Sequence, residues 1–236
     1  MRIAKALALA GIESRRKAEA YVLEGAITVN GKVVKDLGRQ VEPDTDKITF
    51  RGKPVVFQKK VYYLLNKPAG YTTTVSDPHA SKTVMELLPS EFNLFRLFPV
   101  GRLDRESTGL LLMTNDGDLA QKLTHPRYGV GKRYEVTVDK SLETGILKRL
   151  MRGVELAEGL AKAEQIEVLS NTKVRLLLRE GKKREIRRMF EQNGYIVKTL
   201  CRIEFGPLKL EQLAAGSGRV LTAQELDRLR KTSPAS

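Results

Sequence analysis

The residue best suited to chemistry is a single carboxylate set between two arginines. It lies in the sequence GRLDR at residues 101–105, where Arg102 and Arg105 flank Asp104. Nearby positive charges keep a carboxylate ionised even where it is partly buried. An ionised, oriented carboxylate can act as a nucleophile on a sugar carbon, as it does in retaining glycosidases. It can equally be half of a structural ion pair, and the motif alone leaves both interpretations open.

A second charged stretch, REGKKREIRRMF at residues 179–190, carries six basic and two acidic residues. Its apolar residues recur at the spacing of one helical face, which predicts the start of a docked helix. The cations lie on two sides of that helix, with Lys183 and Arg187 on one and Arg184 and Arg188 on the other. They either face solvent or bind an anion.

The same arrangement occurs near the N-terminus. Ser14 is a typical N-cap residue, and the helical turn that it opens carries Arg15, Arg16 and Lys17. Positive side chains weaken a helix N-terminus, where the helix dipole is already positive. A bound phosphate would remove this conflict, because both the cations and the free backbone N–H groups attract it. A solvated basic turn is the alternative interpretation.

The composition favours a polyanionic partner. The chain of 236 residues has a formal net charge of +14, and residues 1–60 and 61–236 are both basic. No apolar run approaches the ~18 residues that a membrane span needs. The only cysteine is Cys201 and the only histidines are His79 and His125, which disfavours a disulfide framework or a metal site. We expect a cytoplasmic monomer without a metal or other cofactor.

Buried strands and single helices must hold the charged residues in place. Asp104 precedes a strongly apolar segment, and Tyr134 shares strand parity with Val136 and Val138. Frequent strands mixed with single helices predict an α+β domain with a mixed or antiparallel sheet and flanking helices. The expected strands are residues 61–65, 109–114, 132–138, 163–169, 174–178 and 196–205; the expected helices are residues 83–88 and 142–151, one after residue 117, and one opened by the capping box at residues 222–225.

The N-terminal part has a helix–helix–β pattern. The pair Asn30-Gly31 predicts a tight turn between strands at residues 26–29 and 32–34, and a third strand is expected at residues 46–50. This module resembles the S4 RNA-binding domain through AGIESRR at residues 10–16, EG at 24–25 and TVNGK at 28–32. The resemblance implies RNA contacts by Arg15, Arg16, Lys17 and Lys32. We expect this domain at residues 1–55, a linker at 56–60, a larger domain at 61–231 and a disordered tail at 232–236.

Three stretches of the larger domain, in this order, resemble the motifs of RsuA/RluB-type ribosomal RNA pseudouridine synthases. They are YLLNKPAG at residues 63–70, GRLD with TGLL at 101–104 and 108–111, and EGK through RRMF at 180–190. The resemblance implies that Asp104 is the nucleophile and that Arg187 forms an ion pair with it. It also implies that Tyr134 lies next to the target uracil and that Leu200 forms an apolar wall, although Ile203 fits that wall as well.

The sequence therefore predicts an enzyme that isomerises a uridine of ribosomal RNA to pseudouridine. The reaction needs one carboxylate, an aromatic or apolar pocket and basic surfaces for phosphates. Beyond the residues above, Arg102 is expected to bind substrate; the expected RNA contacts outside the N-terminal domain are Lys67, Lys183, Arg184 and Arg188. Within this resemblance, LLMTNDG at residues 111–117 and the His125-Pro126 loop are more similar to the RluB-like branch, which implies 23S rather than 16S ribosomal RNA as the target. A non-catalytic RNA-binding or ribosome-assembly protein is the alternative, and a DNA-binding regulator ranks below it.

Overall fold

The computed structural model describes residues 1–232, which form two compact units. The first comprises Met1–Val61 together with Pro89–Phe98 and Thr114–Gly117. The second comprises Tyr62–Leu88, Pro99–Met113 and, of the described chain, residues 118–232. The tail expected at residues 232–236 lies, apart from its first residue, outside the described residues.

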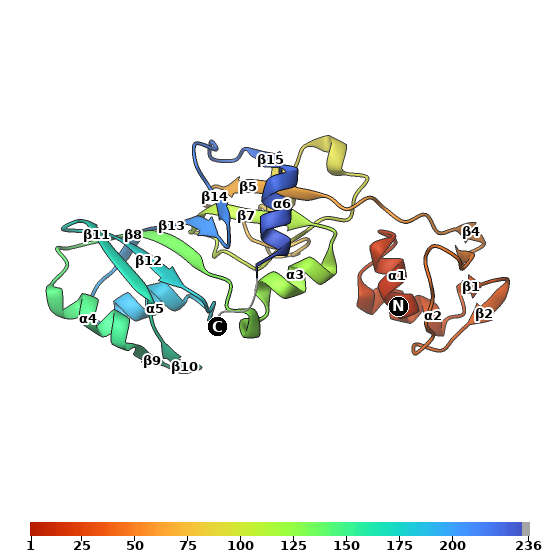
Figure 1. Cartoon of the computed structure of the whole chain (residues 1–236), viewed down its shortest axis with the longest axis horizontal. Helices are drawn as coiled ribbons and strands as arrows, with labels where there is room; N and C mark the ends of the chain where they lie inside the picture. Colours follow the sequence, from red (N-terminus) through yellow and green to blue (C-terminus); the bar gives the residue numbers. More distant parts are fainter. Residues whose placement is uncertain (233–236) are drawn as a thin grey trace. The chain divides into compact units, whose positions relative to one another are not determined.

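Two short helices open the first unit (Figure 1). Helix α1 spans Ile3–Leu9 and α2 spans Arg15–Leu23. The chain turns between them at Gly11, whose φ of +78° is favourable for glycine. The predicted cap of α2 is confirmed, because Ser14 Oγ accepts a hydrogen bond from the Lys17 N–H at 3.3 Å. The buried faces of both helices join one apolar cluster with the adjacent sheet.

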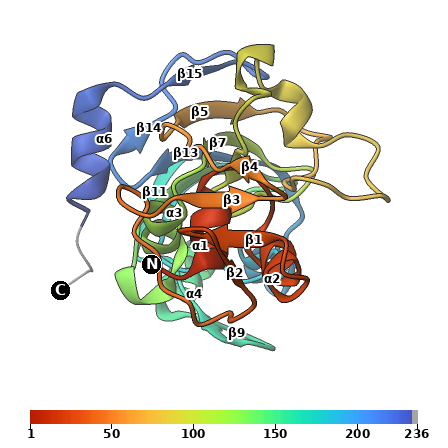
Figure 2. The same cartoon turned by 90° about the vertical axis from the view of Figure 1, so that its right-hand side faces the viewer.

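The predicted hairpin of the first unit is also confirmed. Strands β1 (Ile27–Val29) and β2 (Lys32–Val34) are antiparallel, and Asn30 and Gly31 have φ values of 51° and 79°. Positive φ at both turn residues is what a type I′ turn requires. Strand β1 also pairs with β3 (Ile48–Phe50), which pairs with β4 (Lys53–Pro54), and Figure 2 shows β1 and β3 side by side.

A mixed nine-stranded sheet forms the second unit, as the sequence predicts. Its order is β11-β12-β8-β13-β7-β5-β15, with β14 paired to β13 and β6 paired to β7. The strands are β5 (Tyr62–Lys67), β6 (Phe98–Pro99), β7 (Thr108–Thr114), β8 (Lys132–Val138), β11 (Gln165–Ser170), β12 (Lys173–Leu178), β13 (Val197–Phe205), β14 (Leu208–Lys209) and β15 (Gly218–Val220).

Four helices accompany this sheet: α3 (Gly117–Thr124), α4 (Thr144–Arg152), α5 (Glu185–Glu191) and α6 (Ala223–Arg230). Residues of α4 and α5 pack against the apolar side of β8, β12 and β13 in one core. The predicted capping box of α6 is present, because Thr222 and Glu225 each accept the other's backbone N–H. The helix expected at residues 83–88 is shorter and tighter than predicted: it is a 3₁₀ helix at Val84–Leu87. Two further 3₁₀ helices lie at Ser90–Phe92 and Pro126–Tyr128.

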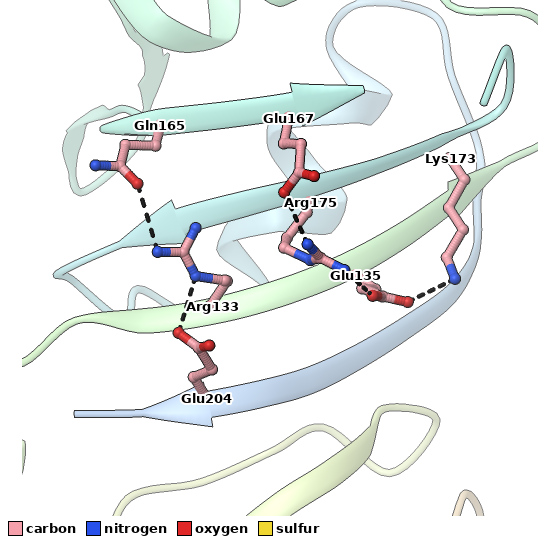
Figure 3. Close-up of polar contacts among 7 residues, drawn as sticks. All are labelled: Arg133, Glu135, Gln165, Glu167, Lys173, Arg175 and Glu204. Atoms are coloured by element: carbon pink, nitrogen blue, oxygen red, sulfur yellow. Dashed lines mark hydrogen bonds and ion pairs between the residues drawn. The ribbon is translucent and has the colours of Figure 1, made fainter. Parts of the chain in front are cut away.

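The opposite side of the same sheet is polar (Figure 3). Arg133 on β8 bonds Glu204 on β13 at 2.9 Å, and Arg175 on β12 bonds Glu135 on β8 at 2.8 Å. Because neighbouring side chains on a strand point to opposite faces, this polar ladder leaves Tyr134 on the apolar face. The sheet register therefore decides the side on which Tyr134 can act.

One parallel junction joins the two halves of the sheet. Strands β7 and β13 run parallel, with Thr108 opposite Cys201 and Gly109 opposite Arg202. A Cβ atom at Gly109 would lie 2.3 Å from the Arg202 carbonyl oxygen, and the φ of Gly109 is +101°. Only glycine allows the two backbones to approach this closely.

The sequence did not predict the small antiparallel pair β9 (Val154–Leu156) and β10 (Gly159–Ala161). No helix in residues 1–232 is long and apolar enough to cross a membrane.

Candidate active site

A small cavity in the second unit gathers most of the predicted site residues. Its volume is about 80 Å³, and its lining includes Asp104, Tyr134 and Leu200 together with Arg102 and Arg184. These residues come from the loop before β7, from β8 and β13, and from the N-terminal end of α5. The fold thus brings together residues up to about one hundred positions apart in the sequence.

Backbone contacts hold the loop that carries Asp104. Thr73 Oγ1 donates to the Leu103 carbonyl oxygen at 2.7 Å and accepts from the Leu103 N–H at 3.3 Å. Arg105 Nε donates to the Gly70 carbonyl oxygen at 3.2 Å, and the Gly70 N–H donates to the Arg105 carbonyl oxygen at 2.8 Å. The half-buried Asp104 carboxylate accepts no hydrogen bond from any of the residues that the structure describes. Its oxygen atoms are thus available to a ligand in the cavity.

Lys67 lies under this loop and corrects one prediction. Its side chain is fully buried, and Nζ contacts four carbonyl oxygens: those of Pro68 at 3.1 Å, Asp104 at 3.1 Å, Arg105 at 3.2 Å and Ser107 at 2.7 Å. Lys67 is therefore wrongly predicted as an RNA contact. Strand β5 continues past the apolar run to residue 67 and carries this lysine inside the protein.

The charge of Lys67 is costly to bury. Desolvation lowers the pKa of its ammonium group to about 8, while the nearby Glu106 and Asp104 act in the opposite direction. The protonated amine has three N–H donors for the surrounding carbonyl oxygens. Lys67 is thus a positioning residue: it holds the backbone carbonyl groups of Asp104, Arg105 and Ser107.

The expected ion pair between Asp104 and Arg187 is the second correction. Arg187 Nη1 donates to the Val197 carbonyl oxygen at 3.1 Å, and among residues 1–232 no ion pair joins Arg187 to Asp104. Helix α5 begins at Glu185, so Arg187 lies within its first turn and bonds the start of β13 instead. Sequence motifs give no information about such a local backbone partner.

Arg184 is the arginine of α5 that lines the cavity. Its Nη1 forms an ion pair with Glu106 at 3.2 Å, and its backbone is left-handed, with φ of 51°. The pKa of the Glu106 carboxyl is lowered by its own backbone N–H and then by Arg184 and Arg187. Arg102 also lines the cavity and is exposed. The cations that line the cavity are therefore Arg102, Lys182 and Arg184, whereas Arg187 does not line it.

Tyr134 and Leu200, which the resemblance places beside the uracil, both line this cavity. Tyr134 is half-buried against the core of the second unit, and Leu200, opposite Val136 in the sheet register, is 6% exposed. Leu200 lines the cavity, whereas Ile203 does not. These side chains can enclose a flat base beside the carboxylate.

The remaining predicted contacts divide into free and paired cations. Arg15, Arg16, Lys32 and Lys183 are exposed, and the exposed Lys17 forms an ion pair with Glu13 at 3.3 Å. Arg188 is half-buried and forms an ion pair with Glu158 at 2.7 Å.

Sequence reasoning missed Thr73 and Glu185. Thr73 holds Leu103, and Glu185 lines the cavity with its pKa raised by burial. Nothing in the local pattern distinguishes Thr73 from its neighbours. For Glu185 the sequence did contain a signal, because this acidic residue lies within a strongly basic stretch, directly between Arg184 and Ile186. No group of three or more metal-binding side chains occurs in the described chain.

Comparisons with known proteins agree with these observations. A family model described as RNA pseudouridylate synthase matches residues 61–192, and the S4 domain model matches residues 1–46. An uncharacterised RNA pseudouridine synthase of Aquifex aeolicus is 43% identical over 98% of this chain and 94% of that protein. The ribosomal large subunit pseudouridine synthase B of Bacillus subtilis is 40% identical over 97% of this chain and 95% of that protein. A crystal structure of a pseudouridylate synthase matches with a TM-score of 0.70 and 28% identity, covering 97% of this chain and 99% of that chain.

Proposed function

Because this chain belongs to the RNA pseudouridylate synthase family and carries an S4 domain, we propose that it converts a specific uridine of large-subunit ribosomal RNA to pseudouridine with Asp104 as the nucleophile. The observation that carries the proposal is the unpaired Asp104 carboxylate, which lines one cavity with Tyr134 and Leu200.

The chemistry fits one carboxylate. Asp104 attacks C1′ of the ribose, and the N1–C1′ bond breaks with its electrons going to uracil. The uracil turns, its C5 bonds to C1′ and the Asp104–C1′ bond breaks. The C5 proton is then lost to restore the ring, and N1 takes up a proton. Substrate and product are isomers, so no water is consumed. The family reaction therefore needs a nucleophile, a base pocket and a held backbone.

The walls of the cavity support specific roles. Tyr134 stacks on or beside the uracil, and Leu200 closes the apolar side of the pocket. Arg102 and Arg184 bind the ribose-phosphate near Asp104, and Arg187 adds to the positive field that also lowers the pKa of Glu106. The exposed Lys183 extends this basic surface. Arg188 contributes to this basic surface mainly through its ion pair with Glu158.

We assign RNA placement to the N-terminal domain at residues 1–55. Its cations Arg15, Arg16, Lys17 and Lys32 are exposed, and the first three lie at a helix N-terminus that attracts phosphate. The large-subunit target is favoured by the 40% identity to a relative named for that subunit.

Tritium release tests the reaction. Ribosomal RNA labelled with 5-³H-uridine loses tritium when C5 forms its bond to C1′, so wild-type protein is expected to release tritium. Asp104→Asn keeps the shape of the side chain but removes its negative charge, and release should fall by about 10³-fold or more. The exposed Asp44→Asn is the matched control. Equal activity of Asp104→Asn and wild type would reject Asp104 as the nucleophile.

Chemical mapping identifies the target. Pseudouridines are mapped in both ribosomal RNAs from cells with and without the gene. Loss of one large-subunit position supports the proposed target, whereas loss of a small-subunit position would reject it.

A further inference from the structure

A second, larger cavity adjoins the candidate active site. Its volume is about 500 Å³, which is within the usual range for ligand sites. Five residues line both cavities, so the two spaces share one wall: Arg102, Tyr134, Glu180, Gly181 and Lys182. The reaction steps described above do not use the second cavity.

Positive charge dominates the lining of this cavity. The cations are Arg102, Lys132, Arg179, Lys182 and Arg202, and the carboxylates are Glu158 and Glu180. Several of these charges already have partners: Arg179 bonds Glu164, Glu158 bonds Arg188, and Lys182 bonds Glu180. The described residues provide no carboxylate partner within 4 Å of Lys132 or Arg202.

Arg202 carries an unsatisfied donor at this cavity. Its side chain is 2% exposed, and its Nε donates to the Leu110 carbonyl oxygen at 2.7 Å. Its Nη2 is buried and has no hydrogen-bond partner among residues 1–232. Buried polar groups are nearly always paired in folded proteins, so an unpaired guanidinium donor beside a cavity indicates a missing acceptor.

Lys132 is the second cation without a carboxylate partner. Its Nζ donates to the Glu180 carbonyl oxygen at 3.0 Å. Burial, and then repulsion from Arg202, lower the pKa of Lys132 to about 8. Two cations that repel each other across a cavity are both relieved by one anion between them.

We propose that this cavity binds a phosphodiester group of the nucleotide next to the target uridine, with Lys132 and Arg202 as its anchoring cations. The inference rests on the proposed function, because it assumes that the anion belongs to an RNA substrate. A uridine that leaves its stack must rotate about its backbone, and a fixed neighbouring phosphate holds that backbone in the rotated state. Arg102 and Tyr134 then touch both the target nucleotide and its neighbour.

RNA binding by the full chain tests the subsite. The probe is an in vitro transcript of 23S ribosomal RNA, and filter binding gives Kd at several salt concentrations. Lys132→Gln should raise Kd about tenfold and lower the slope of log Kd against log salt by about one, which corresponds to one lost phosphate contact. Lys132→Arg should restore both values. The control Lys148→Gln removes an exposed charge of α4 and should change neither.

Arg202→Lys and Arg202→Gln test the buried partner, with thermal unfolding measured alongside. Arg202→Lys keeps the charge and should bind RNA more tightly than Arg202→Gln at equal folded fraction. If Lys132→Gln leaves both Kd and the salt slope unchanged, the cavity does not bind RNA phosphate.

Two further measurements separate the possible failures. Absence of tritium release by wild type would reject the proposed function, whereas the binding slope tests the subsite independently of activity. Calorimetric titration with inorganic phosphate tests a free anion as the ligand. Phosphate binding that Lys132→Gln abolishes, without any change in the RNA slope, would assign the cavity to a free anion and overturn the RNA subsite.

Discussion

Lys67 and the cations of the α2 turn were both predicted to contact RNA, yet the structure places them in opposite environments. Lys67, under the Asp104 loop, is fully buried and surrounded by four carbonyl oxygens. Arg15, Arg16 and Lys17, in the first turn of α2, are exposed, and only Lys17 has a carboxylate partner. Lys67 donates hydrogen bonds to backbone carbonyl oxygens of its own chain, whereas the cations of the α2 turn are accessible to a partner. The neighbouring apolar pattern, and not the charge itself, therefore separates a buried cation from an exposed one.

The largest effect is expected for substitution of the buried Lys67. Lys67→Met leaves buried carbonyl oxygens without their donor and should cost about 3 kcal/mol or more of the free energy of unfolding. A small displacement of Asp104 should reduce tritium release about 100-fold. Urea unfolding and the tritium assay measure these effects, with Lys148→Met as the exposed control. Wild-type stability and activity of Lys67→Met would show that Lys67 does not hold the loop.

The pH dependence of stability should separate Lys67 from an ordinary lysine. At pH values below about 8 both the folded and the unfolded chain keep the proton on Lys67. Between about pH 8 and the usual lysine pKa near 10.4 only the unfolded chain keeps it, so this group makes stability rise with pH. The free energy of unfolding of wild type relative to Lys67→Met should therefore increase by about 3 kcal/mol between pH 7 and pH 11.

Urea unfolding of both proteins at several pH values measures this difference, because the other lysines titrate in both. A constant difference across this range would mean that the buried amine keeps an ordinary pKa.

Substitutions in the exposed α2 turn should weaken RNA binding strongly and change the free energy of unfolding only slightly, in contrast to Lys67→Met. The combined variant Arg15→Gln, Arg16→Gln and Lys17→Gln should weaken RNA binding about tenfold or more and lower the salt slope by up to about three. Its kcat should be unchanged. Because these cations oppose the helix dipole, the free protein should become slightly more stable, by about 0.5 kcal/mol.

A charge-matched control is available on α4, where Lys148→Gln, Arg149→Gln and Arg152→Gln remove the same net charge. If this control weakens RNA binding equally, net charge rather than the α2 turn determines affinity.

The smallest effect is expected at the cap of the same turn. Ser14→Ala removes the side-chain acceptor of the Lys17 N–H and should cost about 1 kcal/mol of the free energy of unfolding. Activity at saturating RNA should not change, in contrast to Lys67→Met. Chemical denaturation and single-turnover kinetics check the two expectations. A loss of activity at saturating RNA would indicate that this turn influences the Asp104 site.

Local signals in the sequence predicted much of the fold. Ser14, the Asn30-Gly31 turn and the Thr222–Glu225 capping box act within a few residues, so their geometry follows from residue type. The β9–β10 pair has short strands without a strong turn signal and was missed.

The candidate site was less predictable because it depends on distant contacts. Motif resemblance brought Asp104, Tyr134 and Leu200 together correctly in one cavity. It could not predict that Lys67 is enclosed by carbonyl oxygens or that Arg187 bonds Val197. The partners of Lys67 and Arg187 are backbone carbonyl oxygens. Every residue type has this group, so residue types do not reveal the contacts.

The Asp104 cavity can form only after strand β13 has been synthesised, because β13 pairs in parallel with β7. This pairing joins Thr108 to Cys201, and Leu200 lies on the same late strand. Nascent chains fold from the N-terminus as they are synthesised, and contacts between distant residues form slowly. The helices and hairpin at residues 3–34 contain mainly local contacts and can fold first. A growing chain therefore exposes the basic α2 turn well before the cavity lined by Asp104, Tyr134 and Leu200 can close.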